Sequence, residues 1–212
     1  MEFFAYLLDL VLHLDRHLVA MVQEHGVWIY VILFAIIFAE TGFVVTPFLP
    51  GDSLLFVAGA VAASGGMNVH LLVFLLVVAA ITGNMVNYAI GRWLGKRFFT
   101  DKGSRWLNPR HLETAHAFYE KHGGKAVVIS RFLPIVRTYI PFVAGLGAME
   151  PARFTMFNVA GALLWVGSLC YAGFFFGNIP WIKGNLTLII VGIIVVSLLP
   201  LAWAWIKSRQ SR

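Results

Sequence analysis

Four ionisable side chains stand within strongly apolar stretches of the sequence. Two are acids, Glu40 and Asp52, and two are arginines, Arg131 and Arg137. An ionised group at the centre of a bilayer costs about 2.5 to 3.5 kcal/mol on insertion scales. We therefore expect these groups to face one another or water. An arginine is a planar, permanently charged fork that suits phosphate oxygens, and a nearby carboxylate can neutralise it when no phosphate is bound.

Helix-breaking residues accompany all four side chains. On an unbroken helix, Arg131 and Arg137 would point about 240° apart, by the roughly 100° per residue of an α-helix. Pro134 lies between them and breaks such a helix, so both guanidinium groups can turn toward one point. The same argument applies to Glu40 and Asp52. The breaks are predicted at Pro47, Pro50, Gly51, Pro134 and Pro141.

Each ionisable residue also has a simpler interpretation. Asp52 or Ser53 can cap a half-helix that starts at Leu54. The two arginines can be anchors whose charged ends reach a membrane interface. Glu40 can be a structural partner of one arginine and nothing more. The position of all four at broken-helix tips favours a functional site over these interpretations.

The elements that carry these residues are predicted to be membrane helices. The chain has 212 residues, of which 59% are hydrophobic and 12% charged, and its mean hydropathy is +0.81. An ordinary soluble domain is about a quarter charged. Uncharged runs over 71–91, 154–182 and 184–206 each exceed the roughly 18 to 20 residues that cross a bilayer core. This composition excludes a soluble enzyme and predicts an all-α polytopic membrane protein.

The chain is expected to divide into an N-terminal helix, a membrane domain and a tail. Residues 1–26 are predicted to form an amphipathic helix at the membrane surface. The membrane domain is predicted over 27–206, and 207–212 form a basic tail. The membrane domain is predicted to contain two repeats, each of which combines a re-entrant helical hairpin with a transmembrane helix. The expected parts of the domain are repeat 1 at 27–91, a basic segment at 92–125, repeat 2 at 126–182 and a last transmembrane helix at 184–206.

Basic residues indicate how the chain is oriented. The sequence has 16 Lys and Arg against 10 Asp and Glu, a net charge of +6. Cytoplasmic loops carry the excess of basic residues, which places 92–125 and the C-terminal tail in the cytoplasm. The first hairpin then opens to the outside and the second to the cytoplasm. Residues 1–26 contain one basic side chain, so their side stays undetermined.

Short motifs recur in the two predicted repeats. Phe-Leu-Pro occurs at 48–50 and 132–134, Phe-Val-Ala-Gly at 56–59 and 142–145, and Tyr-Ala at 88–89 and 171–172, with offsets of 84, 86 and 83. Three matches in order at nearly one offset indicate a duplicated unit. With the orientation above, the copies are inverted, a plan that recurs in transporters with the substrate site at the repeat interface.

Longer motifs around these residues resemble the DedA family of bacterial inner-membrane proteins. The wider group includes the SNARE-associated Golgi proteins, which share the VTT domain. The first motifs are Phe-Ala-Glu-Thr-Gly at 38–42, the Pro-Gly-rich run at 47–59 and the glycine–tyrosine segment at 83–92. The others are Phe-Tyr-Glu-Lys-His-Gly-Gly at 118–124 and Arg-Phe-Leu-Pro-Ile-Val-Arg-Thr at 131–138. The resemblance covers nearly the whole chain. It implies head-to-head re-entrant hairpins, an essential acidic pair on Glu40 and Asp52, and an essential arginine pair on Arg131 and Arg137.

The resemblance also implies a function. Members are implicated in moving lipids between leaflets, notably the carrier lipid undecaprenyl phosphate, in dependence on the proton motive force. Arg131 and Arg137 would then bind the lipid phosphate. Glu40 and Asp52 would couple binding to protons, because protonating a carboxylate releases an arginine. We therefore expect a multi-pass inner-membrane flippase for cell-envelope synthesis, with membrane lipids and protons as its partners.

Other functions stay open from the sequence alone. A broader phospholipid flippase or scramblase fits, as does a proton-coupled small-cation or drug antiporter that supports the membrane potential. The enzymatic alternative is a lipid phosphatase, but we expect no enzyme. Gly-Asp-Ser-Leu at 51–54 matches a serine-hydrolase signature, yet no histidine follows His122. We expect no cofactor, no metal site and no nucleic-acid partner. The single cysteine, Cys170, excludes a metal site made of several cysteines. A homo-oligomer stays open.

Overall fold

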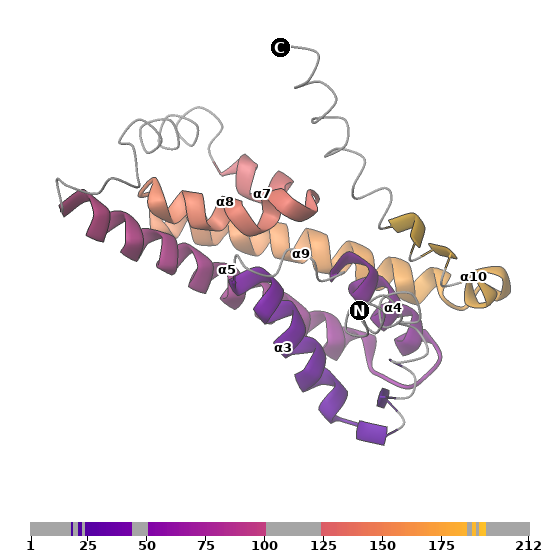
Figure 1. The fold of residues 1–212 in the computed structure, drawn as a ribbon. Helices are drawn as coiled ribbons and strands as arrows, with labels where there is room; N and C mark the ends of the chain where they lie inside the picture. The colour runs from indigo at the N-terminus through magenta and orange to yellow at the C-terminus, as the bar shows by residue number, and fades with distance from the viewer. Residues whose placement is uncertain are drawn as a thin grey trace, which may run out of the picture. The chain divides into compact units, whose positions relative to one another are not determined.

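The computed structural model describes a helical protein. It covers residues 18, 21–22, 24–43, 51–100, 124–185, 188–189 and 191–193, and for 96–100, 134, 135, 183 and 184 the backbone alone. Every regular element in these residues is a helix, which confirms the all-α class there (Figure 1). The helices are α3 (Trp28–Gly42), α4 (Gly51–Ala63), α5 (Val69–Thr100), α7 (Lys125–Ser130), α8 (Pro134–Leu146), α9 (Pro151–Phe176) and α10 (Pro180–Gly184).

Two of these helices are long and apolar enough to cross a membrane. They are Val69–Gly95, within α5, and Pro151–Phe176, which is α9. At a rise of about 1.5 Å per residue, α9 is roughly 39 Å long, against a hydrocarbon core of about 30 Å. Both begin within three residues of the apolar runs at 71–91 and 154–182. The predicted positions of these two long apolar helices are therefore confirmed.

The remaining apolar helices are shorter than a bilayer core. Helix α3 has 15 residues, α4 and α8 have 13 each, and α7 has 6. Even the longest is roughly 22 Å, so none of the four can cross a hydrocarbon core alone. Helix α7 packs beside α8 in a tight pair (Figure 1).

The chain folds into two compact units. Among the described stretches, unit 1 contains 24–34, 51–76 and 166–185, and unit 2 contains 35–43, 77–100 and 124–165. Helices α3, α5 and α9 contribute residues to both units.

Unit 1 is built on a close crossing of α4 and α9. A Cβ on Gly59 would overlap the backbone oxygen of Cys170, and a Cβ on Gly173 would overlap that of Phe56. Because glycine has no Cβ, the two backbones come into direct contact, as at many membrane helix interfaces. The buried face of α4 is mostly apolar and includes Leu55 and Val57, both 0% exposed, together with the polar Ser53, 1% exposed. This crossing is tightly packed.

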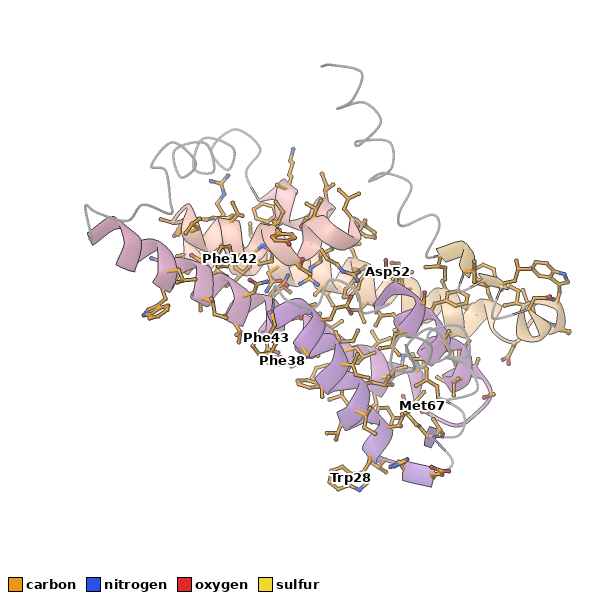
Figure 2. All side chains as sticks on the ribbon, in the orientation of Figure 1. Trp28, Phe38, Phe43, Asp52, Met67 and Phe142 are labelled. Carbon is orange, nitrogen blue, oxygen red and sulfur yellow. The ribbon has the colours of Figure 1, made fainter. Side chains whose placement is uncertain are left out.

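Unit 2 is built on a similar crossing, between α5 and α8. A Cβ on Gly91 would overlap the backbone oxygen of Phe142, and a Cβ on Gly145 would overlap that of Tyr88. The Tyr88 hydroxyl donates to the Met149 carbonyl beyond the end of α8. Figure 2 labels Phe142 on α8. Glycines again bring two helices into backbone contact.

The second predicted helix break lies where the sequence placed it. Helix α7 ends at Ser130 and α8 begins at Pro134, with Pro134 at its N-terminus. A proline is tolerated at the first helical position because its missing N–H has no intrahelical partner there. The break at Pro134 is therefore confirmed, and it leaves Arg131 between two helices.

Two other predicted breaks need correction. Pro141 lies inside α8, so it does not end a helix. It removes the bond to the carbonyl of Arg137, but a membrane helix tolerates this because neighbouring groups can satisfy the freed carbonyl. Gly51 is the first residue of α4 rather than part of the break, so the half-helix starts three residues before Leu54. The other two predicted breaks, Pro47 and Pro50, lie outside the described residues.

Several predicted segments fall largely outside the described residues. These are the N-terminal helix at 1–26, most of the basic segment at 92–125, most of the last helix at 184–206 and the tail at 207–212. Their place in the domain division stays a prediction.

Candidate functional site

An ion pair joins α3 to α8 inside unit 2. Glu40 lies in the last turn of α3 and is 1% exposed. Its Oε1 accepts from Nη2 of Arg137, which lies in the first turn of α8 and is 6% exposed. The helix is interrupted between α7 and α8, and Arg137 of α8 lies against α3. Two of the four residues singled out from the sequence are thus in direct contact.

Neutral oxygens surround the second arginine. Arg131 follows α7 directly and is 2% exposed. Its Nη2 donates to Asn158 Oδ1 at 2.6 Å, and to the carbonyls of Ala80 at 3.3 Å and Asn158 at 3.4 Å. Its Nε is buried with no hydrogen-bond partner among the described residues. Arg131 is therefore anchored without a carboxylate in this part of the chain.

One face of α9 receives both arginines. Asn158, Gly161 and Trp165 are spaced by three and four residues, which puts them on one side of a helix. The Arg131 stem passes over Gly161, where a Cβ would lie 2.9 Å from its Cδ. The indole of Trp165, 1% exposed, lies 5.8 Å from Arg131 Cζ and 4.9 Å from Arg137 Cζ. Both distances suit cation–π attraction, which strengthens when the cation is desolvated.

Two asparagines of α5 complete the network. Nδ2 of Asn87 donates to the carbonyls of Thr41, at 3.2 Å, and Thr138, at 2.8 Å, so it ties α3 and α8 to α5. As placed, Nδ2 of Asn84 donates to Asn158 Oδ1 at 3.1 Å. With the amide turned, its oxygen faces Arg131 Nη2 at 2.9 Å and its nitrogen faces the Thr41 carbonyl at 3.3 Å. The orientation of such an amide is assigned from its hydrogen-bond partners.

The buried charges of this network do not cancel. Among the described residues, the buried charged side chains are Glu40, Arg131 and Arg137. Counted over these described side chains alone, two guanidinium groups and one carboxylate have one net positive charge. A buried uncompensated charge is costly and marks a functional position inside a membrane. The arrangement suits a ligand that brings one or two negative charges, such as a phosphate.

The fourth predicted site residue lies in the other unit. Asp52 stands in the first turn of α4, near the start of the helix (Figure 2). A carboxylate there is favourable for the helix dipole. The structure thus brings Glu40, Arg131 and Arg137 together in one unit and places Asp52 in unit 1.

Sequence reasoning missed four residues that contact the arginines or the backbone beside them: Asn84, Asn87, Asn158 and Trp165. Each lies in a long apolar helix, where a neutral side chain attracts less notice than a charge. The three asparagines still carried a signal. An amide inside a spanning helix usually hydrogen-bonds to a neighbouring helix, so three of them pointed to a polar interface.

Comparison with known proteins places these residues in a family. The family model described as "VTT domain" matches residues 49–175, a range that includes Asp52, Arg131 and Arg137. The chain is 55% identical over 202 residues to Protein DedA of Escherichia coli strain K12, a match that covers 94% of this chain and 92% of that protein.

Other relatives are named as membrane proteins. The chain is 43% identical over 155 residues to inner membrane protein YqjA of Escherichia coli strain K12, covering 72% of this chain and 69% of that one. It is 42% identical over 179 residues to an uncharacterized membrane protein of Mycobacterium leprae, covering 84% and 80%. No solved structure matches the chain.

Proposed function

We propose that this chain is a lipid transporter. The proposal starts from its family, because the chain belongs to the DedA family of VTT-domain membrane proteins. In this proposal it moves an anionic lipid between the leaflets of the bacterial inner membrane and depends on the proton motive force. The preferred substrate is the carrier lipid undecaprenyl phosphate, which serves cell-envelope synthesis.

The net positive charge of the buried network is the observation that carries the proposal. Arg131 and Arg137 contact the same indole, and one carboxylate accompanies them in unit 2. A lipid phosphate that enters this network would accept charge-assisted hydrogen bonds from planar guanidinium forks. A neutral headgroup would leave the excess charge uncompensated. The site therefore favours an anionic headgroup.

The Glu40–Arg137 pair supplies the coupling to protons. While Glu40 is ionised it occupies Arg137. Protonating Glu40 would remove that compensation and make Arg137 available to a phosphate. Binding and protonation then favour each other, as linkage requires. Asp52, the other acid expected to couple to protons, would act from the start of α4.

We also propose that two re-entrant hairpins in inverted repeats form the transport domain. The helices expected to form the hairpins, α3 with α4 and α7 with α8, are too short to cross a bilayer alone. The glycine contacts of α4 with α9 resemble those of α8 with α5. In this topology 92–125 and the C-terminus lie in the cytoplasm, and we propose a transporter rather than an enzyme.

Reconstitution of the purified protein in liposomes tests this function. Vesicles would contain undecaprenyl phosphate, and an impermeant phosphatase added outside would report how fast the inner-leaflet lipid becomes accessible. We expect faster exposure with an imposed proton gradient, and loss of that effect in Glu40→Gln. Arg131→Lys keeps the charge but loses the fork, so we expect slower exposure.

Three outcomes would contradict the proposal in different ways. Equal movement of phosphatidylethanolamine without a gradient would indicate a scramblase. Release of phosphate without added phosphatase would indicate an enzyme. Proton-coupled cation movement with no lipid movement would indicate an antiporter.

A further inference from the structure

The two arginines of the site are held by groups of different charge. Arg137 is paired with the carboxylate of Glu40. Arg131 donates to two carbonyl oxygens and to the amide oxygen of Asn158. A carboxylate compensates a guanidinium charge, whereas neutral oxygens orient the group and leave its charge in place. Among the described residues, one arginine of the site is thus paired with a carboxylate and the other is held by neutral oxygens.

Asn158 is the centre of the neutral cradle. It is 0% exposed, and its Oδ1 lies 2.6 Å from Arg131 Nη2. Its Nδ2 donates to the Ile81 carbonyl at 3.1 Å, which fixes the amide with its oxygen toward the arginine. The amide therefore joins α5, α9 and Arg131. A carboxylate at this position would accept from Arg131 but could not donate to Ile81.

The neighbouring positions on α9 support the same geometry. Gly161 leaves room for the Arg131 stem, and a Cβ there would lie 3.1 Å from Nε. Nε itself has no hydrogen-bond partner among the described residues. A buried N–H in that state is a donor that a phosphate oxygen can satisfy.

We propose that Asn158 is a positioning residue that keeps Arg131 charged and uncompensated, so that Arg131 is the arginine that receives the lipid phosphate. Arg137, paired with Glu40, serves the proton-dependent step. This division of roles rests on the proposed function and deepens it. It predicts that the neutrality of the side chain at 158 matters more than its size.

The test is binding of undecaprenyl phosphate to the purified full-length protein in detergent, measured over a series of pH values. Asn158→Asp places a carboxyl group beside Arg131. The positive charge of Arg131 favours the ionised form of this carboxyl group at neutral pH. We expect binding to weaken by about ten- to a hundred-fold relative to wild type. Toward acidic pH the introduced carboxyl takes up a proton, so the ratio to wild type should approach one.

Two further variants separate charge from structure. Asn158→Leu removes the cradle oxygen and adds no charge, so its loss of affinity should be smaller and should not recover in acid. Asn185→Asp makes the same exchange in unit 1, where the side chain donates to the Trp181 carbonyl, and serves as the matched control. Glu40 and Arg137, the other buried charged groups of the described network, are present in every variant, so the ratio to wild type isolates the introduced carboxyl.

Equal affinity of Asn158→Asp and wild type at neutral pH would overturn the inference. So would a loss that is the same in Asn158→Asp and Asn158→Leu at every pH, because it would show a purely structural role. If the pH-dependent loss is found but the wild-type protein moves no lipid in liposomes, the transporter proposal fails and the neutral cradle stands.

Discussion

Two helix crossings in this protein share a backbone contact and differ in polarity. In unit 1, Gly59 of α4 lies against the Cys170 carbonyl of α9. In unit 2, Gly145 of α8 lies against the Tyr88 carbonyl of α5. The second contact repeats in the same way, with Gly173 against Phe56 in unit 1 and Gly91 against Phe142 in unit 2.

The matching residues are separated by constant sequence distances. Phe56 and Phe142, like Gly59 and Gly145, are 86 positions apart. Tyr88 and Cys170, like Gly91 and Gly173, are 82 positions apart. The short helix and the long helix of each crossing thus keep their own offsets. This regularity supports the proposal of a duplicated unit and repeats the Phe-Val-Ala-Gly match at an offset of 86. It pairs Tyr88 with Cys170 rather than with Tyr171, so the Tyr-Ala match at an offset of 83 is displaced by one residue from the equivalent positions.

The side chains around the two crossings are different. Eighty-two positions after Asn84 the chain has Val166, and 82 positions after Asn87 it has Leu169. Val166 is 0% exposed within an apolar crossing, whereas Asn84 contacts an arginine and a backbone carbonyl. The comparison teaches that the glycines specify how the helices cross, and that the polar side chains add a binding site to one crossing.

The largest expected effect removes the charge partner in the polar unit. Glu40→Leu leaves the Arg137 guanidinium buried without its carboxylate, which should cost about 3 to 5 kcal/mol of unfolding free energy. Chemical denaturation in mixed micelles measures this. Glu40→Leu combined with Arg137→Leu should be less destabilised than Glu40→Leu alone, because the Arg137 charge is removed together with its partner. A double variant as unstable as the sum of the single ones would contradict the pairing.

The next effect is shared by both units. Gly59→Ala and Gly145→Ala each insert a Cβ against backbone, which a flexible side chain cannot relieve. We expect each to lose about 1 to 3 kcal/mol of unfolding free energy, by similar amounts. Lipid exposure in liposomes should fall more in Gly145→Ala, because α8 carries Arg137. Equal loss of transport at equal loss of stability would show that the polar unit has no special role.

The last pair of variants exchanges polarity between the units and includes the smallest expected effect, that of Asn84→Val. Asn84→Val should change the unfolding free energy by only about 0.6 kcal/mol, the average for hydrogen bonds between membrane helices. Val166→Asn should cost about 1 to 3 kcal/mol, because it buries an amide where the crossing is apolar. The same denaturation assay compares them. If Val166→Asn were neutral, unit 1 would contain polar partners that the comparison denies.

Charge was the property that the sequence revealed best. Glu40, Arg131 and Arg137 stand out because an ionised side chain in an apolar segment needs a partner, and the structure brings these three together in unit 2. The break before Pro134 was also predictable, since proline fits the first position of a helix. The relation of Asp52 to the arginines stays a prediction.

The neutral part of the site could not be predicted in the same way. Asn158 and Trp165 are ordinary residues for a membrane helix until another segment supplies an arginine beside them. That arginine lies 27 positions before Asn158 in sequence, so no local pattern links them. The predicted helix break at Pro141 was wrong because it used only the local rule that proline interrupts a helix. In a membrane domain, surrounding helices can satisfy the carbonyl that proline frees, so the helix continues.

In this account, the two buried arginines and one buried carboxylate of the described part of unit 2 receive a phosphate. The most direct measurement compares the affinities of undecaprenyl phosphate and undecaprenol for the purified protein, since the two lipids differ only in the phosphate. We predict that the wild-type protein prefers the phosphate by about ten-fold or more and that Arg131→Met abolishes the preference. Equal affinities in wild type, or a preference that survives in Arg131→Met, would contradict this account.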